Sequence, residues 1–395
     1  MKNQANSSYV LFVILLTIPL SGVGVDLYAP ALPAMAIAFG VSPAVIKLTI
    51  STYLIGICLG QFISGTLSDC FGRKPLQWFG SGLFIVSSLL AAGSFNMTLM
   101  LCCRFLQGFS SGSMSAAARS QVPDLFSKER IKHIASYLAL AWGIGPIVAP
   151  WIGGYLQYYI GWRACFYFYA LYGALLFGLV SLLKESIQQK TPLNIVLLVK
   201  NYKTVLRHPQ FMGALVILGV MYVVLVLFGI AGPFIIQVTY HLSAVVYGYL
   251  ALFVGAAYLS GALTGKYFHR VAEHVRLQHT MIVMIILSVI IGILSLFIHR
   301  VILYVVYVFI INFCVGLIYP VCFALSMSLF REMSGIASAV TGFGIMFIAG
   351  LVSVIAGCIH VTMVYQVILI YLVLVMVCLL LYWAVLKSHF MGELR

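Results

Sequence analysis

Long apolar runs separated by short polar turns occupy almost the whole of this 395-residue chain. A run of about 20 apolar residues is long enough to cross the hydrocarbon core of a bilayer as an α-helix. About twelve such runs can be recognised, and the chain is 63% hydrophobic and only 8% charged. A soluble protein of this length could not bury so much apolar surface, whereas a multi-pass membrane protein exposes it to lipid. The sequence therefore predicts an all-α integral membrane protein.

A polar, basic stretch divides the runs into two sets of six. This stretch, residues 184–209, is expected to form a cytoplasmic linker, with a helix over residues 194–206 lying on the membrane surface. We therefore expect an N-terminal six-helix bundle (1–183) and a C-terminal six-helix bundle (210–395). The expected spans are residues 9–27, 43–67, 76–93, 97–118, 133–158, 162–183, 210–235, 244–265, 279–298, 302–329, 335–358 and 364–387.

One polar turn has a counterpart in the other half of the chain. Residues 261–270 resemble residues 65–75, and Gly65 aligns with Gly261 at an offset of 196 positions. Because this offset is close to half of the chain length, we expect a tandem duplication and two pseudo-symmetric bundles. Internal repeats of this kind are typical of transporters.

The charged residues orient the chain in the membrane. The net charge is +14, but the cations are scattered through short turns rather than gathered on one face, which argues against nucleic acid as a partner. Most Lys and Arg residues fall on the cytoplasmic side if both termini are cytoplasmic, as the preference of positive charge for that side requires. We therefore expect the N and C termini in the cytoplasm.

The sequence contains no arrangement typical of an enzyme. Nine Cys residues lie mostly inside apolar runs, without metal-ligand spacing or a disulfide framework. No nucleophile–base set and no phosphate-binding glycine loop can be recognised. We expect neither catalysis nor a cofactor or metal.

Asp26 is the one acidic residue, out of eight, that falls inside an expected span. A carboxylate within the bilayer is costly, so it normally faces a cavity or a partner. At 1.5 Å per residue, Asp26 lies roughly 25 Å into its run, toward the outer third of the membrane. Two interpretations stay open: a carrier of a coupled proton, or an interfacial cap at the end of the first helix.

Arg104 is the natural partner of Asp26. It lies at a similar estimated depth in the fourth run, and Gln107 follows one turn deeper on the same helical face. Arginine stays charged under all ordinary conditions, so Arg104 could hold Asp26 ionised and then release it. The alternative is a permanent structural ion pair. No His falls in the middle of a span, so a His relay is not expected.

Helix-breaking residues are concentrated in the fifth run. Proline kinks a helix and glycine allows another helix to pack closely, so this run is expected to be bent and tightly packed. Close packing alone and a role in limiting leakage through the centre of the protein are both compatible with this pattern. The residues are Gly145, Pro146, Pro150, Gly153 and Gly154.

Aromatic and amide side chains within the spans are candidates for a substrate cavity. Most aromatic residues of a membrane protein face lipid or pack in the interior, so each candidate also has that simpler explanation. The candidates are Tyr28, Tyr53, Gln61, Trp142, Phe228, Asn312 and Tyr319.

Three of these motifs resemble those of the major facilitator superfamily. The turn after the second run is similar to the superfamily's signature between helices two and three, and the fourth and fifth runs are similar to its fourth-helix and antiporter motifs. The matching residues are Gly65, Asp69, Gly72, Arg73 and Lys74 in the turn, Arg104, Gln107 and Gly108 in the fourth run, and Gly145, Pro146, Pro150, Gly153 and Gly154 in the fifth.

Residues 26–33 and 161–163 resemble the bicyclomycin and chloramphenicol resistance (Bcr/CflA) branch of drug–proton antiporters. Cys70 and Pro123 depart from the pattern of that family, at positions that concern gating. The resemblance places Asp69 at an interface that opens and closes between the two halves.

The resemblance implies two six-helix bundles around a central cavity, in a monomer that lies in a bacterial inner membrane. It further implies a proton-coupled secondary active exporter of small amphipathic compounds that works by alternating access. Its partners would then be the small-molecule substrate, protons and the lipid bilayer. A transporter dedicated to one metabolite or siderophore remains the alternative. A non-transporting receptor or scaffold is a remote one, because the acid within a span and the antiporter motif speak against it.

Overall fold

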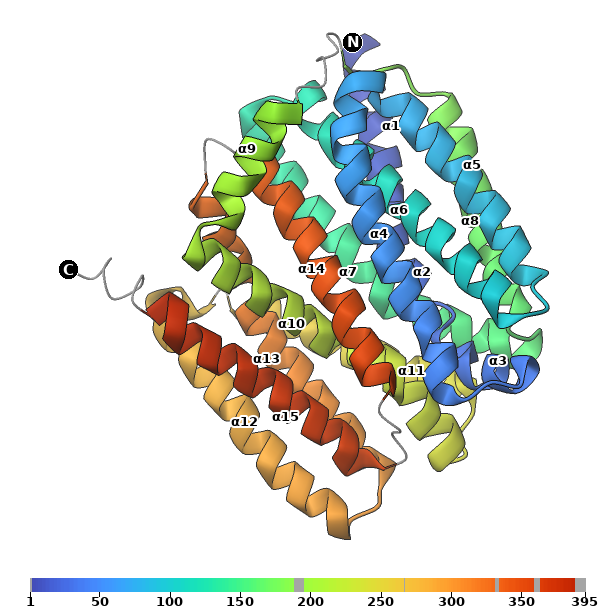
Figure 1. Cartoon of the computed structure of the whole chain (residues 1–395), viewed down its shortest axis with the longest axis vertical. Helices are drawn as coiled ribbons and strands as arrows, with labels where there is room; N and C mark the ends of the chain where they lie inside the picture. Colours follow the sequence, from blue (N-terminus) through green and yellow to red (C-terminus); the bar gives the residue numbers. More distant parts are fainter. Residues whose placement is uncertain (1, 188–194, 266, 331–333, 359–362, 388–395) are drawn as a thin grey trace. The chain divides into compact units, whose positions relative to one another are not determined.

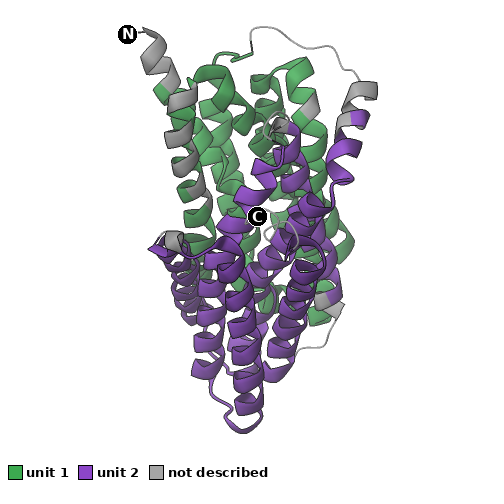
Figure 2. Ribbon diagram, turned by 90° about the vertical axis from the view of Figure 1, so that its left-hand side faces the viewer, with its two compact units in different colours: residues 1–195 green, residues 196–395 purple. Residues whose placement is uncertain are grey.

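The computed structural model describes residues 2–187, 195–265, 267–330, 334–358 and 363–387, although some side chains within these helices are not described. All regular structure within these ranges is helical, as expected (Figure 1). The chain divides into two compact units, residues 1–195 and 196–395, which Figure 2 distinguishes by colour. The division falls inside the stretch 184–209 that was expected to link two bundles.

The helices of unit 1 pack mainly as the pairs α4–α6, α5–α6 and α5–α8. Pro146 and Pro150 lie inside α7 without ending it. The elements are α1 (Lys2–Thr17), α2 (Leu20–Asp26), η1 (Ala29–Ala31), α3 (Leu32–Phe39), α4 (Pro43–Phe71), α5 (Arg73–Ala92), α6 (Met97–Leu125), α7 (Lys128–Tyr159) and α8 (Arg163–Ser181).

The helices of unit 2 pack mainly as the pairs α11–α13, α10–α14 and α12–α15. The elements are α9 (Ile195–Leu206), α10 (Pro209–Pro233), η2 (Phe234–Thr239), α11 (Ala244–Thr264), η3 (Tyr267–Arg270), α12 (Glu273–Phe297), α13 (Val301–Ser328), α14 (Ser334–Cys358), α15 (Val364–Leu381) and η5 (Tyr382–Leu386).

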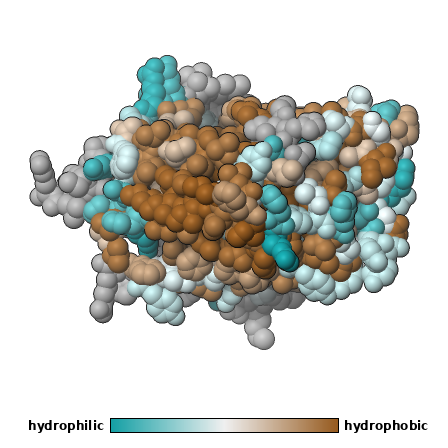
Figure 3. All heavy atoms as spheres, turned by 90° about the horizontal axis from the view of Figure 1, so that it is seen from below, coloured by the Kyte–Doolittle hydropathy of each residue, from teal (hydrophilic) through white to brown (hydrophobic). Residues whose placement is uncertain are grey.

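Ten helical segments are long and apolar enough to cross a membrane. Two further helices, α6 with 29 residues and α7 with 32, have the length but are less apolar. In α6 the cause is visible, because Arg104, Gln107 and several serines are buried inside the unit and away from lipid. The twelve long segments therefore correspond to the twelve expected spans. Figure 3 shows a broad hydrophobic area on the face that it draws, as a lipid-exposed surface requires.

The first span is longer than its expected end near residue 27. The helical segment continues to Phe39, which makes a span of 32 residues from Ser8. Pro30 and Pro33 lie in the first turns of η1 and α3, where a missing backbone N–H is tolerated. Asp26 therefore lies inside this longer segment and not at its end.

The polar turn expected at residues 65–75 is much shorter than its sequence suggested. Helix α4 runs to Phe71 and α5 begins at Arg73, so the break is confined to Gly72. Gly72 has a φ of 112°, a conformation that favours glycine over residues with a side chain.

The internal repeat exists in the helix packing but in a different register from the expected 196 positions. A Cβ atom on Gly60 would lie 2.1 Å from the carbonyl oxygen of Phe109, and one on Gly261 would lie 2.1 Å from that of Phe313. Gly60 and Gly261 are thus equivalent, 201 positions apart. Gly65, the expected counterpart of Gly261, has no such neighbour. Close helix contact, rather than the resemblance of two turns, identifies the equivalent residues.

Candidate functional site

Arg104 on α6 is completely buried and holds several elements of unit 1 together. Its Nη2 donates to the carbonyl oxygen of Gly24 at 2.7 Å, and its Nη1 donates to Oε1 of Gln107 at 2.7 Å. Its Nε donates to the carbonyl oxygen of Thr49 at 3.4 Å. These bonds join the first span, α4 and α6 at one buried cation.

Two tyrosine rings enclose the guanidinium group. The Cζ atom of Arg104 lies 4.2 Å from the ring centroid of Tyr28 and 4.2 Å from that of Tyr53. The hydroxyl groups hold the rings in place: that of Tyr28 is hydrogen-bonded to Oγ1 of Thr49 at 2.8 Å, and that of Tyr53 donates to the carbonyl oxygen of Leu20 at 3.2 Å. A desolvated cation between aromatic faces gains about 2 kcal/mol or more from each favourable contact. Two of the candidates for a substrate cavity, Tyr28 and Tyr53, therefore enclose the arginine.

Gln107 extends this network to α5. Its Nε2 donates to Oγ of Ser88 at 2.8 Å, and that hydroxyl group in turn donates to the carbonyl oxygen of Phe84 at 2.6 Å. Because Gln107 is fully buried, its Nε2 depends on Ser88 for a hydrogen-bond partner. The amide thus holds the guanidinium group of Arg104 on the side opposite Gly24.

Asp26 is partly exposed and forms no hydrogen bond or ion pair with any residue that the structure describes. It therefore does not cap a helix, which was one of its two expected roles. Nor is it directly paired with Arg104, because the donors of that guanidinium group point to Gly24, Thr49 and Gln107. The connection runs through the backbone instead: the carbonyl group that Arg104 binds is two residues from Asp26.

The glycines of the antiporter motif pack against the segment that carries Asp26. A Cβ atom on Gly153 would lie 1.6 Å from the carbonyl oxygen of Leu27, and one on Gly145 would lie 3.2 Å from that of Pro19. Only glycine at position 153 allows this backbone contact between α7 and the first span. Pro150 and Gly154 are also buried, and the side chain of Trp142 lies outside the described residues.

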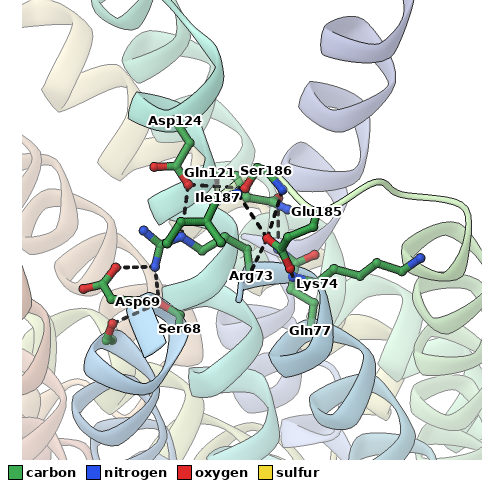
Figure 4. A network of polar contacts seen from close by, with 11 residues as sticks. Ser68, Asp69, Arg73, Lys74, Gln77, Gln121, Asp124, Glu185, Ser186 and Ile187 are labelled. Carbon is green, nitrogen blue, oxygen red and sulfur yellow. Dashed lines mark hydrogen bonds and ion pairs between the residues drawn. The ribbon is translucent and has the colours of Figure 1, made fainter. Parts of the chain in front are cut away.

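A second polar cluster lies where α4, α5 and α6 end or begin (Figure 4). Arg73, the first residue of α5, forms an ion pair with Asp69 and a second one with Asp124, whose Oδ2 accepts from its Nε at 3.0 Å. Its Nη1 also donates to Oγ of Ser68 at 2.6 Å. Arg73 is buried between these partners, so the turn motif is an ordered ion network.

Glu185, just after α8, completes this cluster and was not among the expected site residues. Its carboxylate accepts from the backbone N–H groups of Arg73 at 3.0 Å and Lys74 at 3.2 Å, so it caps the N-terminus of α5. A Cβ atom on Gly72 would lie 2.4 Å from Oε2 of Glu185, a second reason for glycine there. The signal in the sequence was an acid immediately after a span, which we interpreted only as part of the linker.

The start of the linker is also attached to this cluster. Oγ of Ser186 donates to Oδ2 of Asp124 at 3.2 Å, and its backbone N–H donates to Oε1 of Glu185 at 2.9 Å. Nζ of Lys74 donates to the carbonyl oxygen of Ser181 at 2.9 Å. The network therefore fixes α4, α5, α6 and the end of α8 to one another.

The remaining cavity candidates do not gather around one site within either unit. Gln61 is buried on α4, Asn312 donates to the carbonyl oxygen of Val308 on its own helix, and Tyr319 packs against Tyr258. Phe228 is stacked on other aromatic rings of unit 2.

A cavity of about 360 Å³ in unit 1 has apolar walls from the first span, α7 and α8, and none of the cavity candidates whose side chains the structure describes lines it. The proposal that these residues line a substrate cavity between the two units stays a prediction.

The comparisons with known proteins agree with this architecture. Residues 14–354 match the model of the Major Facilitator Superfamily. The chain is 27% identical over 362 residues to an uncharacterised MFS-type transporter, YdgK, of Bacillus subtilis, which covers 90% of this chain and 89% of that protein. It is 29% identical over 216 residues to a bicyclomycin resistance protein homologue of Haemophilus influenzae, which covers 53% of this chain and 54% of that protein.

Solved structures extend the agreement to the fold. The xylose transporter XylE of E. coli matches with a TM-score of 0.70 at 16% identity, over 96% of this chain and 98% of that one. At this level of identity the match concerns the fold alone. The family model, by contrast, covers most of the chain. The chain is therefore a member of the Major Facilitator Superfamily, a membrane transporter and not an enzyme.

Proposed function

We propose that this transporter exports small amphipathic compounds in exchange for protons, by alternating access in a bacterial inner membrane. The name of the Haemophilus relative, a bicyclomycin resistance protein homologue, supports a drug substrate over about half of the chain. The antiporter motif that packs against the first span supports exchange rather than uptake. Both termini lie in the cytoplasm in this proposal, which places the Arg73 cluster at the cytoplasmic face.

The observation that carries the proposal is the unpaired carboxylate of Asp26 inside an apolar helical segment that is long enough to span a membrane. Coupling to protons requires a group that changes its protonation during the cycle. Arg104 cannot be that group, because a guanidinium group stays protonated. A proton moving down 100 mV releases about 2.3 kcal/mol, enough to sustain roughly a 40-fold gradient of substrate.

The charge of Asp26 controls the position of the Arg104 guanidinium group in this proposal. When Asp26 is ionised, its carboxylate attracts the guanidinium group away from the carbonyl oxygen of Gly24. When Asp26 is protonated, that attraction ends and Arg104 returns to Gly24 and the two tyrosine rings. The first span therefore changes its attachment to α6 with each proton, and the contact of Gly153 with Leu27 transmits the movement to α7.

The Arg73 cluster serves as the rigid end of unit 1 in this cycle. Asp69 is the least buried member of its ion pair, with 49% of its side chain exposed against 7% for Arg73. It is therefore the acid available to exchange partners when the two units move, which is the gating role we propose for it. Loss of Asp69 should slow the exchange between conformations more than it weakens substrate binding.

An efflux assay tests the proposal. An efflux-deficient bacterium that expresses the protein is exposed to a panel of amphipathic antibiotics and, in parallel, its accumulation of polar metabolites and siderophores is measured. The proposal predicts resistance to several unrelated amphipathic compounds, which a protonophore abolishes. Resistance to none of them, together with transport of one metabolite, would instead establish a dedicated transporter.

A further inference from the structure

Helix α9 is short, amphipathic and free of acidic residues. Tyr202, Val205 and Leu206 share one side of the helix, since residues three and four positions apart are neighbours. Val205 is completely buried, whereas Leu206 leaves 48% of its side chain exposed. One side of α9 thus presents both a buried contact and an exposed apolar residue.

Three cations occupy a different side of the same helix. Lys200, Lys203 and Arg207 follow one another at spacings of three and four residues and are all exposed. No ion pair involves them among the residues that the structure describes. A face with three exposed positive charges and no anion calls for a negatively charged partner.

The end of α9 is fixed at the start of a membrane span. The backbone N–H groups of Arg207 and His208 close the helix on the carbonyl oxygens of Lys203 and Val205 at 3.1 and 3.2 Å. Nδ1 of His208 then accepts from the backbone N–H of Phe211 at 3.4 Å, which caps α10. The chain changes direction at this point, so α9 does not extend the axis of α10 (Figure 1).

The ring of His208 packs against Phe330, at 5.3 Å between ring centroids, and so attaches this turn to the segment after α13. The first spanning residue is Pro209, so Arg207 lies within roughly 7 Å of the end of the span. Lys203 follows about 6 Å further along the helix. Arg207 is therefore held beside the lipid headgroups, and Lys203 and Lys200 reach them when α9 lies along the membrane surface.

We propose that α9 binds acidic phospholipids at the membrane face where α10 begins. Lys200, Lys203 and Arg207 contact the anionic headgroups, and Leu206 enters the acyl boundary beside them. An amphipathic helix with a cationic polar side is the arrangement that lies in the interface of an acidic membrane. The binding fixes the linker between the units to the bilayer surface and does not depend on which compound is transported.

Lipid binding to the purified full-length protein tests this inference. The protein in neutral detergent is titrated with phosphatidylglycerol or with phosphatidylcholine, and the lipid-bound fraction is measured by native mass spectrometry. We expect tighter binding of phosphatidylglycerol, and a loss of about 100-fold in its affinity in the triple variant Lys200→Gln, Lys203→Gln and Arg207→Gln, or about fivefold for each cation. Raising the salt concentration should remove most of the preference.

A matched variant replaces three other exposed cations, Arg130→Gln, Arg300→Gln and Lys387→Gln. It carries the same loss of net charge and should keep at least most of the phosphatidylglycerol binding. Equal binding of the two lipids by the wild type, or equal losses in the two triple variants, would overturn the inference. Displacement of the lipid by millimolar inorganic phosphate would also overturn it, because the site would then recognise phosphate without a membrane.

Discussion

The two units share their closest helix contacts but differ in the chemistry beside them. In unit 1, a Cβ atom on Gly112 would lie 2.3 Å from the carbonyl oxygen of Ile57, and in unit 2 one on Gly316 would lie 2.3 Å from that of Tyr258. The same register, 204 positions, places Val308 where unit 1 has Arg104. Val308 is completely buried and apolar. The duplication has thus kept the backbone contacts, while at this position only unit 1 carries a buried cation.

The serines next to these positions show the same contrast. Ser88 and Ser288 are both buried, and each donates to the carbonyl oxygen four residues earlier. Ser88 accepts from Gln107 in the arginine network, whereas Ser288 is hydrogen-bonded to the hydroxyl group of Tyr307 at 2.8 Å. Unit 2 has a tyrosine cluster where unit 1 has a charged one. In the mechanism that we propose, unit 1 carries the ionic steps and unit 2 supplies a matching scaffold.

The largest difference between the units is expected at the Arg104 position. Arg104→Leu removes the cation and leaves the buried Oε1 of Gln107 without its partner, at about 1–3 kcal/mol, while the carbonyl oxygen of Gly24 keeps only the 3.3 Å bond from the hydroxyl group of Tyr169. We expect uphill export to fall by about 100-fold or more, measured with equal amounts of folded protein. Val308→Ala removes only packing, so export should stay within about threefold of the wild type and stability should fall by about 1–2 kcal/mol. Equal effects of the two substitutions would break the comparison.

The shared glycines should respond alike in both units. Gly60→Ala and Gly261→Ala each place a methyl group against a carbonyl oxygen, and each should cost about 1–3 kcal/mol of stability or more, because a helix pair must separate. Thermal unfolding of the purified variants in detergent measures this. A large loss for one glycine and none for the other would show that the two helix pairs are not equivalent.

Glu185 belongs to the Arg73 cluster of unit 1. Its substitution should lower stability by less than the glycine substitutions do. Glu185→Ala removes the cap of α5 and should lower stability by about 1–2 kcal/mol. Glu273→Ala, which removes an acid in the first turn of α12, is the matched control and should lower stability by only about 0.3 kcal/mol. Thermal unfolding of the purified variants measures this difference. Equal decreases in the unfolding temperature would show that Glu185 does not stabilise the start of α5.

The smallest effects on stability are expected for Ser88 and Ser288. Their effects on export should differ between the two units. Ser88→Ala and Ser288→Ala should each cost about 1 kcal/mol of stability, since each leaves one buried donor without its partner. Only Ser88→Ala should also slow export, because Gln107 then positions Arg104 less firmly. Transport rates at matched protein levels separate a loss of stability from a loss of export. Slower export by Ser288→Ala alone would show that unit 2, and not unit 1, carries the ionic steps.

Sequence patterns predicted the helical membrane class, because the length and hydropathy of each apolar run are strong signals that do not depend on the rest of the chain. They also singled out Asp26 and Arg104 as exceptional, since charged residues within a span are rare. They could not predict the partners of Arg104, which depend on the direction of one guanidinium group among three helices. They also ended the first span near residue 27, whereas the helical segment continues through Pro30 and Pro33, since proline is tolerated in the first turn of a helix.

The role of Glu185 could not be predicted either. Its partners, the N–H groups of Arg73 and Lys74, lie more than 100 positions away in the sequence. A carboxylate beyond the end of a span usually faces water, and only the tertiary packing of α8 beside α5 brings it to a helix N-terminus. The repeat register was missed for a similar reason, since Gly60 is marked by the helix that it touches and not by its neighbours in the chain.

The protonation of Asp26 is the centre of this account, and one measurement tests it directly. Purified wild type, Asp26→Asn and the control Glu273→Gln are reconstituted into liposomes with an imposed pH gradient, and uphill substrate transport and substrate-induced proton movement are recorded together. The account predicts that Asp26→Asn loses both signals and retains downhill exchange of substrate, while Glu273→Gln matches the wild type. Undiminished proton-coupled transport by Asp26→Asn would contradict it.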